Sequence, residues 1–220
     1  MAVLMGALLY AFSFWTIFAA VRHPYFMNPM IYFPLVLAGA DRIFRKKRPF
    51  LYIFSLAAAV MSNFYFGYMI CLLVMLYCIF RYKAVFGTFR LKQLAGWGGR
   101  FLGYSVIALL LSSVILLPVA LCALQSGRIS TDHWISLLYP LSYYKKFITA
   151  FLSGEAGYWS EMGYTAYGVL GVFLLFLQKK KNTLLKIGFC LMTAFMLLPF
   201  AGYALNGFAY VANRYAWAYG

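Results

Sequence analysis

The stretch Ser62-Asn63-Phe64-Tyr65-Phe66-Gly67-Tyr68-Met69 interrupts an apolar run that extends from Pro49 to Phe80. As one unbroken helix, that run would be about 48 Å long at 1.5 Å per residue. The hydrocarbon core of a bilayer is only about 30 Å thick. The run therefore forms either one strongly tilted helix or two short helices that meet at Ser62 and Asn63. The choice decides on which side of a membrane every later segment lies.

The composition of the chain places it in a membrane. Of its 220 residues, 65% are hydrophobic, 21% are aromatic and only 10% are charged. A soluble domain of this length could not bury so much apolar surface. The sequence therefore predicts an all-α, polytopic transmembrane bundle of about seven or eight membrane segments. The net charge of +15 does not indicate nucleic-acid binding, because the basic residues form short clusters between apolar runs, as membrane topology requires.

The apolar runs give the expected order of segments along the chain. They cover residues 1–21, 29–44, 49–61, 64–80, 101–121, 164–177, 184–200 and 211–220. Residues 1–220 are predicted to form one transmembrane domain, within which 123–163 is an extracytoplasmic loop. The basic stretch from Arg81 to Arg100 is expected to connect two of the spans.

The distribution of basic residues decides between one helix and two at Asn63. With a hairpin there, the loops on the cytoplasmic side hold 14 of the 19 basic residues. These are Arg42, Arg45, Lys46, Lys47, Arg48, Arg81, Lys83, Arg90, Lys92, Arg100, Lys179, Lys180, Lys181 and Lys186. A single helix would move a large basic cluster outside, against the positive-inside rule. The sequence therefore predicts a short-helix hairpin over residues 50–80, with its turn in the outer half of the membrane.

An amphipathic helix is predicted in the long outer loop, near residues 135–152. Its apolar stripe consists of Leu137, Leu141, Tyr144, Ile148 and Phe151, and its other side carries Lys145 and Lys146 among smaller polar residues. Two interpretations stay open. The helix lies in the outer membrane interface with its lysines among the lipid head groups, or it packs on the protein's own spans.

Few residues could carry chemistry, and the sequence does not identify a catalytic one. Asp132, His133 and Glu155 in the outer loop are weak candidates for a general base, although adjacent residues such as Asp132 and His133 do not face each other on a helix. The favoured interpretation of Glu155 is a solvated loop acid, and a catalytic pair of Asp132 and His133 is the less favoured interpretation of those two residues. The cysteines lack metal-ligand spacing, so no metal site and no cofactor is predicted.

Five polar residues are candidates for substrate binding. Arg214 is expected at the outer end of the eighth segment, where its guanidinium could either bind a phosphate or snorkel to the interface. The other candidates are Asn213, Arg128, His23 and Asn63. For His23, a structural role at the membrane interface is the more ordinary reading.

Several motifs, in order along the chain, resemble those of the YfhO family of bacterial membrane proteins. They are Gly6 to Ser13, His23 to Pro29, Ser62 to Met69, Leu117-Pro118 with Leu124-Gln125-Ser126-Gly127-Arg128, and Asn206 to Tyr215. The last is similar to a family pattern of the form NG-x-x-Y-x-x-NRW, with Tyr215 in place of Trp. Each motif alone is weak, but together they span nearly the whole chain.

The resemblance implies a GT-C glycosyltransferase architecture. Such a protein would move a sugar from a polyprenyl-phosphate donor to an envelope polymer, such as lipoteichoic or teichoic acid, on the outer face of the cell membrane. Membrane lipid, the lipid-linked donor and the polymer acceptor would be its partners. The catalytic Asp that GT-C enzymes carry in their first outer loop has no counterpart here, so the chain is expected to be a fragment that does not transfer sugar alone. A transporter or flippase of a lipid-linked substrate, or a non-catalytic assembly protein, is the alternative.

Overall fold

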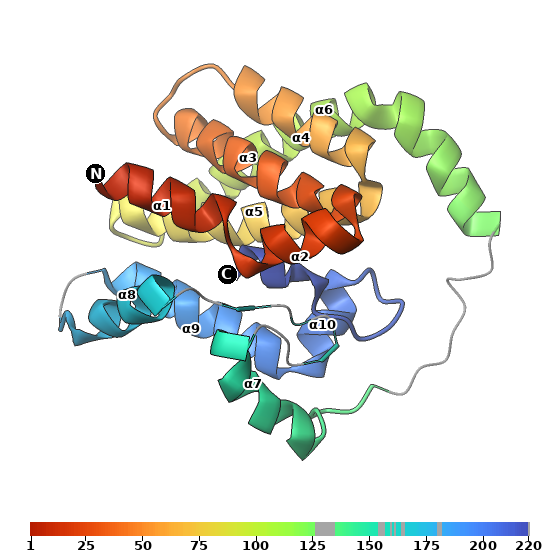
Figure 1. Cartoon of the computed structure of the whole chain (residues 1–220). Coiled ribbons are helices and arrows are strands. Elements are labelled where there is room, and N and C mark those ends of the chain that lie inside the picture. Colours follow the sequence, from red (N-terminus) through yellow and green to blue (C-terminus); the bar gives the residue numbers. More distant parts are fainter. Residues whose placement is uncertain are drawn as a thin grey trace. The chain divides into compact units, whose positions relative to one another are not determined.

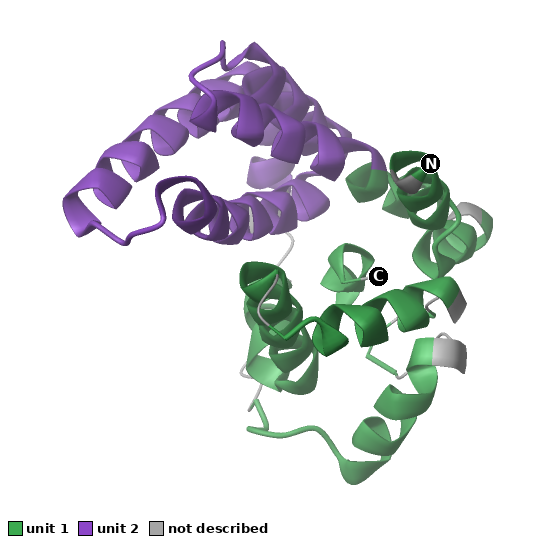
Figure 2. Ribbon diagram, turned by 90° about the vertical axis from the view of Figure 1, so that its left-hand side faces the viewer, with its two compact units in different colours: residues 1–30, 132–220 green, residues 31–131 purple. Residues whose placement is uncertain are grey.

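The computed structural model describes residues 1–125, 135–153, 157–158, 160, 162–163, 166–179 and 182–219. These residues form helices and connecting turns, with no strand among them, which confirms the predicted all-α class. The chain divides into two compact units, residues 1–30 with 132–220 and residues 31–131 (Figure 2). The helices, in chain order, are α1 (Ala2–Ala11), α2 (Phe14–Arg22), η1 (Pro24–Met27), α3 (Asn28–Phe44), α4 (Phe50–Ser62), α5 (Phe64–Phe86), α6 (Leu91–Gln125), α7 (Leu141–Ser153), α8 (Ala166–Leu177), α9 (Thr183–Leu197), α10 (Pro199–Leu205) and η2 (Arg214–Ala218).

The break at Asn63 is present, and it separates α4 from α5. Asn63 has an extended backbone, and its side-chain oxygen accepts hydrogen bonds from the N–H groups of Tyr65 and Phe66 at 3.1 and 3.3 Å. Gly67 then packs so closely on Val60 that a Cβ there would lie 2.9 Å from the Val60 Cα. In a straight helix, residues seven apart would be separated by about 10 Å. The chain therefore reverses at Asn63, as the sequence predicts (Figure 1).

Close helix contacts hold the second unit together. A Cβ on Gly39 of α3 would lie 2.6 Å from the Tyr52 backbone of α4, so only glycine permits this approach. Tyr52 in turn packs edge-on against Phe101 of α6, and its hydroxyl lies 2.8 Å from the Ser105 hydroxyl. Buried aromatic and small residues together thus fix the positions of α3, α4 and α6.

The basic ends of three helices meet at one end of this unit. Asp41 of α3 forms an ion pair with Arg81 of α5, and a second one with Arg45 at 2.6 Å. Trp97 of α6 packs on Phe44 and on Phe86, with ring centroids 5.0 and 5.8 Å apart. The basic clusters of these helices therefore lie together, as the charge count requires, while the side of the membrane that they face stays a prediction.

The stretch from Arg81 to Arg100 differs from the expected loop. It is helical except for residues 87–90, because α5 continues to Phe86 and α6 begins at Leu91. Tyr82 is fully buried, and its hydroxyl donates a hydrogen bond to the Gln93 side chain at 3.1 Å. Such packing favours helix despite the basic residues, whose long side chains can extend away from the apolar contacts.

The first predicted span is two helices rather than one. α1 ends at Ala11, and α2 begins after Ser13, whose hydroxyl accepts a hydrogen bond from the Thr16 N–H at 3.4 Å. Serine favours this N-cap position over the middle of a helix. Trp15 of α2 is buried, and its indole N–H donates to the carbonyl of Phe26 in η1 at 3.2 Å. This contact joins α2 to η1.

The seventh predicted span is bent by 94° between α9 and α10. Pro199 is the cause, because proline lacks a backbone N–H and keeps the preceding residue extended. Leu198 accordingly has φ −115° and ψ 119°. Beyond α10, the expected turn at Asn206-Gly207 is present, and the expected eighth helix is the short 3-10 helix η2.

Two helices in the described part of the chain are long and apolar enough to cross a membrane, α5 and residues 91–122 of α6. The bent pair α9 and α10 would make a third if it acts as one span. The expected number of seven or eight membrane segments stays a prediction.

Helix α7 confirms the helix predicted near residues 135–152, although it begins at Leu141, and the side of the membrane on which it lies stays a prediction. Its packed face is not the predicted stripe, because the buried residues are Tyr143, Phe147 and Ala150. The predicted apolar residues Leu141 and Ile148 are instead 69% and 75% exposed. The helix therefore packs on its own unit with one face and leaves a second apolar face uncovered by described residues.

Candidate functional site

The side chain of Asn213 is the centre of a buried hydrogen-bond network in the first unit. Its Oδ1 accepts a hydrogen bond from the Tyr139 hydroxyl at 3.1 Å. Its Nδ2 donates to the hydroxyls of Ser160 and Tyr143 at 2.9 and 3.1 Å. Asn213, Ser160, Tyr139 and Tyr143 are all buried. An amide offers two donors and an acceptor, so Asn213 can join three hydroxyl groups that come from distant parts of the chain.

Tyrosines of α7 connect this network to the end of α9. The hydroxyls of Tyr143 and Tyr144 donate to the carbonyls of Met196 and Leu197 at 2.7 and 3.1 Å. The last carbonyls of a helix have no partner within it, and Pro199 supplies no N–H for them. The tyrosine hydroxyls therefore satisfy the acceptors that the break at Pro199 exposes.

The hydroxyls in the network are protonated at neutral pH. Burial raises the pKa of Tyr143 to about 12, although its hydrogen bonds to Ser160 and Asn213 lower it in part. Burial also raises the pKa of Tyr215 well above its usual value, and the neighbouring Tyr139 and Tyr143 add to that shift. The Tyr215 hydroxyl is buried and has no hydrogen-bond partner among the described residues. It is thus a neutral donor close to the network.

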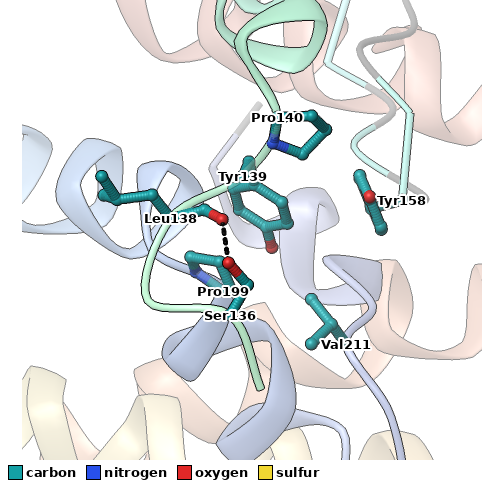
Figure 3. Close-up of a pocket in the computed structure, with 7 residues that line it drawn as sticks. All are labelled: Ser136, Leu138, Tyr139, Pro140, Tyr158, Pro199 and Val211. Atoms are coloured by element: carbon teal, nitrogen blue, oxygen red, sulfur yellow. Dashed lines mark hydrogen bonds between the residues drawn. The ribbon is translucent and has the colours of Figure 1, made fainter. Parts of the chain in front are cut away.

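A cavity of about 580 Å³ lies against Tyr139. Its size falls within the range of roughly 300–1,000 Å³ that is typical of small-molecule sites. Figure 3 shows its lining residues, Ser136, Leu138, Tyr139, Pro140, Tyr158, Pro199 and Val211. The Ser136 hydroxyl donates to the carbonyl of Leu138 at 2.7 Å, which closes a turn beside the cavity.

Tyr158 holds a strained backbone conformation at the wall of this cavity. Its φ is +53°, in the left-handed region, and it follows Gly157 with φ +97°. A bulky residue rarely adopts this conformation, which costs of the order of 1–3 kcal/mol. The Asn213 N–H donates to the Tyr158 carbonyl at 2.7 Å, and the Tyr158 ring lies 4.9 Å from that of Tyr139. The central asparagine thus also fixes the aromatic wall.

The guanidinium of Arg214, the residue after Asn213, lies over the rings of Phe26 and Tyr210, which together form an aromatic shelf. The guanidinium is 5.7 Å from the Phe26 ring centroid and 5.6 Å from that of Tyr210, distances typical of cation–π contacts. Phe26 also packs against the His23 ring, with centroids 5.0 Å apart. A planar cation held in this way is well suited to bind a phosphate through paired hydrogen bonds.

The structure brings together three of the five predicted binding residues. His23 and Arg214 share the ring of Phe26, and Asn213 precedes Arg214 directly. Asn63 belongs to the other unit and caps α5, which is a structural role. Arg128 and the weak catalytic candidates Asp132, His133 and Glu155 lie outside the described residues.

Sequence reasoning missed Tyr139, Tyr143, Tyr158 and Ser160 as members of the site. A signal was present, because four tyrosines occur between residues 139 and 158. It could not be interpreted without their partners, which lie 17 to 74 positions away in the chain.

The arrangement can bind, and the His23 imidazole is the group among its described side chains that can accept a proton. Its other described side chains are a cation, an amide, hydroxyls and aromatic rings, and no group of three or more His, Cys, Asp or Glu residues that could hold a metal occurs in the described part of the chain. The described residues of this unit therefore include a polar aromatic cavity and a separate cation that is suited to bind a phosphate.

Comparison with known proteins agrees with the motifs in the sequence. The family model described as "Bacterial membrane protein YfhO" matches residues 1–219. An aligned segment of 77 residues is 31% identical to the "Uncharacterized protein YfhO" of Bacillus subtilis (strain 168). That segment covers 35% of this chain and 9% of the relative. No solved structure matches the chain.

Proposed function

The chain belongs to the YfhO family of bacterial membrane proteins, and on that premise we propose that it forms part of a cell-envelope glycosyltransferase. The reaction moves a sugar from a polyprenyl-phosphate donor to a polymer of the lipoteichoic or teichoic acid type. It takes place on the outer face of the cell membrane. This chain contributes a binding site for the lipid-linked donor.

The observation that carries the proposal is the position of two consecutive residues. Asn213 holds the hydroxyl of Tyr139, which lines the cavity. Arg214, the next residue in the chain, lies over the rings of the aromatic shelf. Val211, two residues before Asn213, lines the cavity itself. A lipid-linked sugar has the matching chemistry, with an uncharged ring joined to an anionic phosphate. The short segment 211–214 thus supplies a residue at the cavity for the sugar ring, Val211, and a cation for the phosphate, Arg214.

The chemistry of transfer assigns a role to the cation. The acceptor hydroxyl oxygen forms a bond to the anomeric carbon, and the bond from that carbon to the phosphate oxygen breaks. The electron pair leaves with the phosphate, so negative charge develops there, and Arg214 would stabilise it. The acceptor's proton passes to a base, for which Asp132, His133 and Glu155 are the candidates in this chain.

Donor binding by purified protein in lipid nanodiscs tests this proposal. Arg214→Lys keeps the charge but loses the planar fork, and we expect it to weaken binding of a polyprenyl-phosphate sugar about tenfold. Arg214→Ala should weaken it by about a hundredfold, because it removes both the charge and the hydrogen bonds. The matched control is Arg22→Lys, since the Arg22 guanidinium also lies over a ring, that of Phe18, at 5.0 Å.

Two outcomes would change the assignment. Unchanged donor affinity in both Arg214 variants would give Arg214 a structural role and remove the support for the proposal. Movement of the donor across the bilayer without any sugar incorporation would replace the transferase by a flippase, in which the same residues bind the same substrate.

A further inference from the structure

The cavity beside Tyr139 differs in chemistry from the shelf that holds Arg214. No charged side chain occurs among the described residues that line it. The polar groups there are the hydroxyls of Ser136, Tyr139 and Tyr158, and the other lining residues are apolar. Burying an ion without a partner costs several kcal/mol, so this lining selects against anions and cations. Hydroxyl groups beside aromatic and apolar surface suit an uncharged ligand that is itself rich in hydroxyls.

The two tyrosines at the cavity have different roles. Tyr139 is 6% exposed, and its hydroxyl is held by Asn213 at 3.1 Å, so it forms a fixed surface. Tyr158 is 44% exposed and also lines the cavity. Its left-handed backbone, with φ +53°, is kept in place by the hydrogen bond from the Asn213 N–H. Strain that surrounding contacts maintain is a recognised feature of binding sites, and here it places an accessible aromatic ring.

We propose that this cavity is a subsite for the uncharged ring of a saccharide, which stacks on Tyr158 and donates hydrogen bonds to the hydroxyl oxygens of Ser136 and Tyr139, whose own protons are held by Leu138 and Asn213. The apolar face of a pyranose ring packs on an aromatic ring, while its hydroxyls at the edge meet the hydroxyls of the lining. The assignment rests on the proposed function only in taking the saccharide to be the transferred sugar. The phosphate of the same donor belongs to Arg214 and lies outside the neutral cavity.

The rim of the cavity fits a ligand that arrives from the bilayer. Leu138, which lines the cavity, is 61% exposed, and its neighbour Leu137 is 90% exposed. Exposed leucines of this kind are compatible with lipid rather than with water. A sugar attached to a lipid chain could therefore enter with its chain along these leucines and its ring toward Tyr158.

Saturation-transfer NMR on the chain in nanodiscs tests the subsite with soluble probes. The probes are methyl hexopyranosides and the matching methyl glucuronide, which has the same ring with a carboxylate. We expect signal transfer to the ring hydrogens of at least one neutral hexoside. We expect the glucuronide to bind at least tenfold more weakly, because the described residues that line the cavity include no cation for its charge.

Variants of Tyr158 identify the contact. Tyr158→Ala should weaken hexoside binding about tenfold, and Tyr158→Phe, which keeps the ring, should stay within about threefold of the original chain. The matched control is Tyr167→Ala on α8, because Tyr167 is 71% exposed and does not line the cavity. Its binding should be unchanged. Melting temperatures of all three variants show whether each one is folded.

Failure of this subsite can be told apart from failure of the proposed function. Absence of signal for every neutral hexoside, equal binding by folded Tyr158→Ala, or tighter binding of the glucuronide would each overturn the subsite. These results would leave donor binding through Arg214 intact. Conversely, hexoside binding that depends on Tyr158, together with donor affinity that is independent of Arg214, would keep the subsite and remove the transferase proposal.

Discussion

Two asparagines, one in each unit, use the same side chain in different ways. Asn63 accepts hydrogen bonds from the N–H groups two and three residues ahead of it and so begins α5. Asn213 holds hydroxyls from residues that are 53 to 74 positions away in the chain. The first is a local cap at a hairpin turn, and the second is the centre of a tertiary network.

The two asparagines are expected to contribute differently to the stability of their units. The cap at Asn63 satisfies backbone groups that other polar residues could also satisfy. The network at Asn213 satisfies three buried hydroxyls, each of which loses one hydrogen bond if the amide is removed. The second unit therefore tolerates changes at its asparagine better than the first, and the predictions below test this contrast in order of expected effect.

The largest effect is expected for Asn213→Ala. It removes the acceptor of the Tyr139 hydroxyl and the amide donor that Tyr143 and Ser160 share, so that these two keep the hydrogen bond to each other. The expected loss in the free energy of unfolding is about 2–4 kcal/mol. The apparent melting temperature, followed by fluorescence-detected size exclusion, should fall by roughly 4–12 °C. A fall no larger than that of Asn63→Ala would contradict the contrast.

Gly202→Ala should disturb the same network from another direction. A Cβ at Gly202 would lie 2.5 Å from the Asn213 Oδ1 and 3.1 Å from the Tyr139 hydroxyl oxygen. We expect a loss of about 1–3 kcal/mol, typical of overpacking, and weaker donor binding. Gly188→Ala on α9 is the matched control, because a Cβ there meets nothing within 4 Å. Equal melting temperatures for the two variants would show that the network accommodates the added methyl group without loss of stability.

Asn63→Ala should have a smaller effect, about 0.5–2 kcal/mol, because it removes one helix cap. Asn63→Ser should recover most of that loss, since a serine hydroxyl can accept the same hydrogen bond. The melting temperatures of the two variants check this. Failure of serine to restore stability would mean that Asn63 does more than cap α5, and that its place among the binding residues should be reconsidered.

A cysteine at Ala84 should leave stability unchanged and report the orientation of the hairpin. Ala84 is exposed on α5, beyond the basic residue Arg81. In a background without the four native cysteines, an impermeant thiol reagent applied to whole cells should not label it, because the positive-inside rule places this end in the cytoplasm. Labelling from outside would reverse the predicted topology of both units' basic loops.

Much of the helical architecture could be predicted from the sequence. The hairpin at Asn63 and the turn at Asn206-Gly207 depend on residues close in the chain, and both are present. Helices α1 and α2 were expected as one span, because their apolar composition hides the local effect of Ser13. The stretch from Arg81 to Arg100 was expected as a loop, because its charges conceal the packing of Tyr82 and Trp97.

The sequence by itself determined the membrane class of this protein, its family resemblance and the Asn63 cap, and it named Asn213 and Arg214 as candidate binding residues. Only the tertiary structure decided that Tyr139, Tyr143 and Ser160 meet at Asn213, that His23 and Arg214 share the ring of Phe26, and that Tyr158 is held at the wall of a neutral cavity. The physical reason is the range of the interactions. A cap or a turn involves neighbours that the chain itself supplies, whereas a buried network depends on which distant residues the packed helices bring within hydrogen-bond distance.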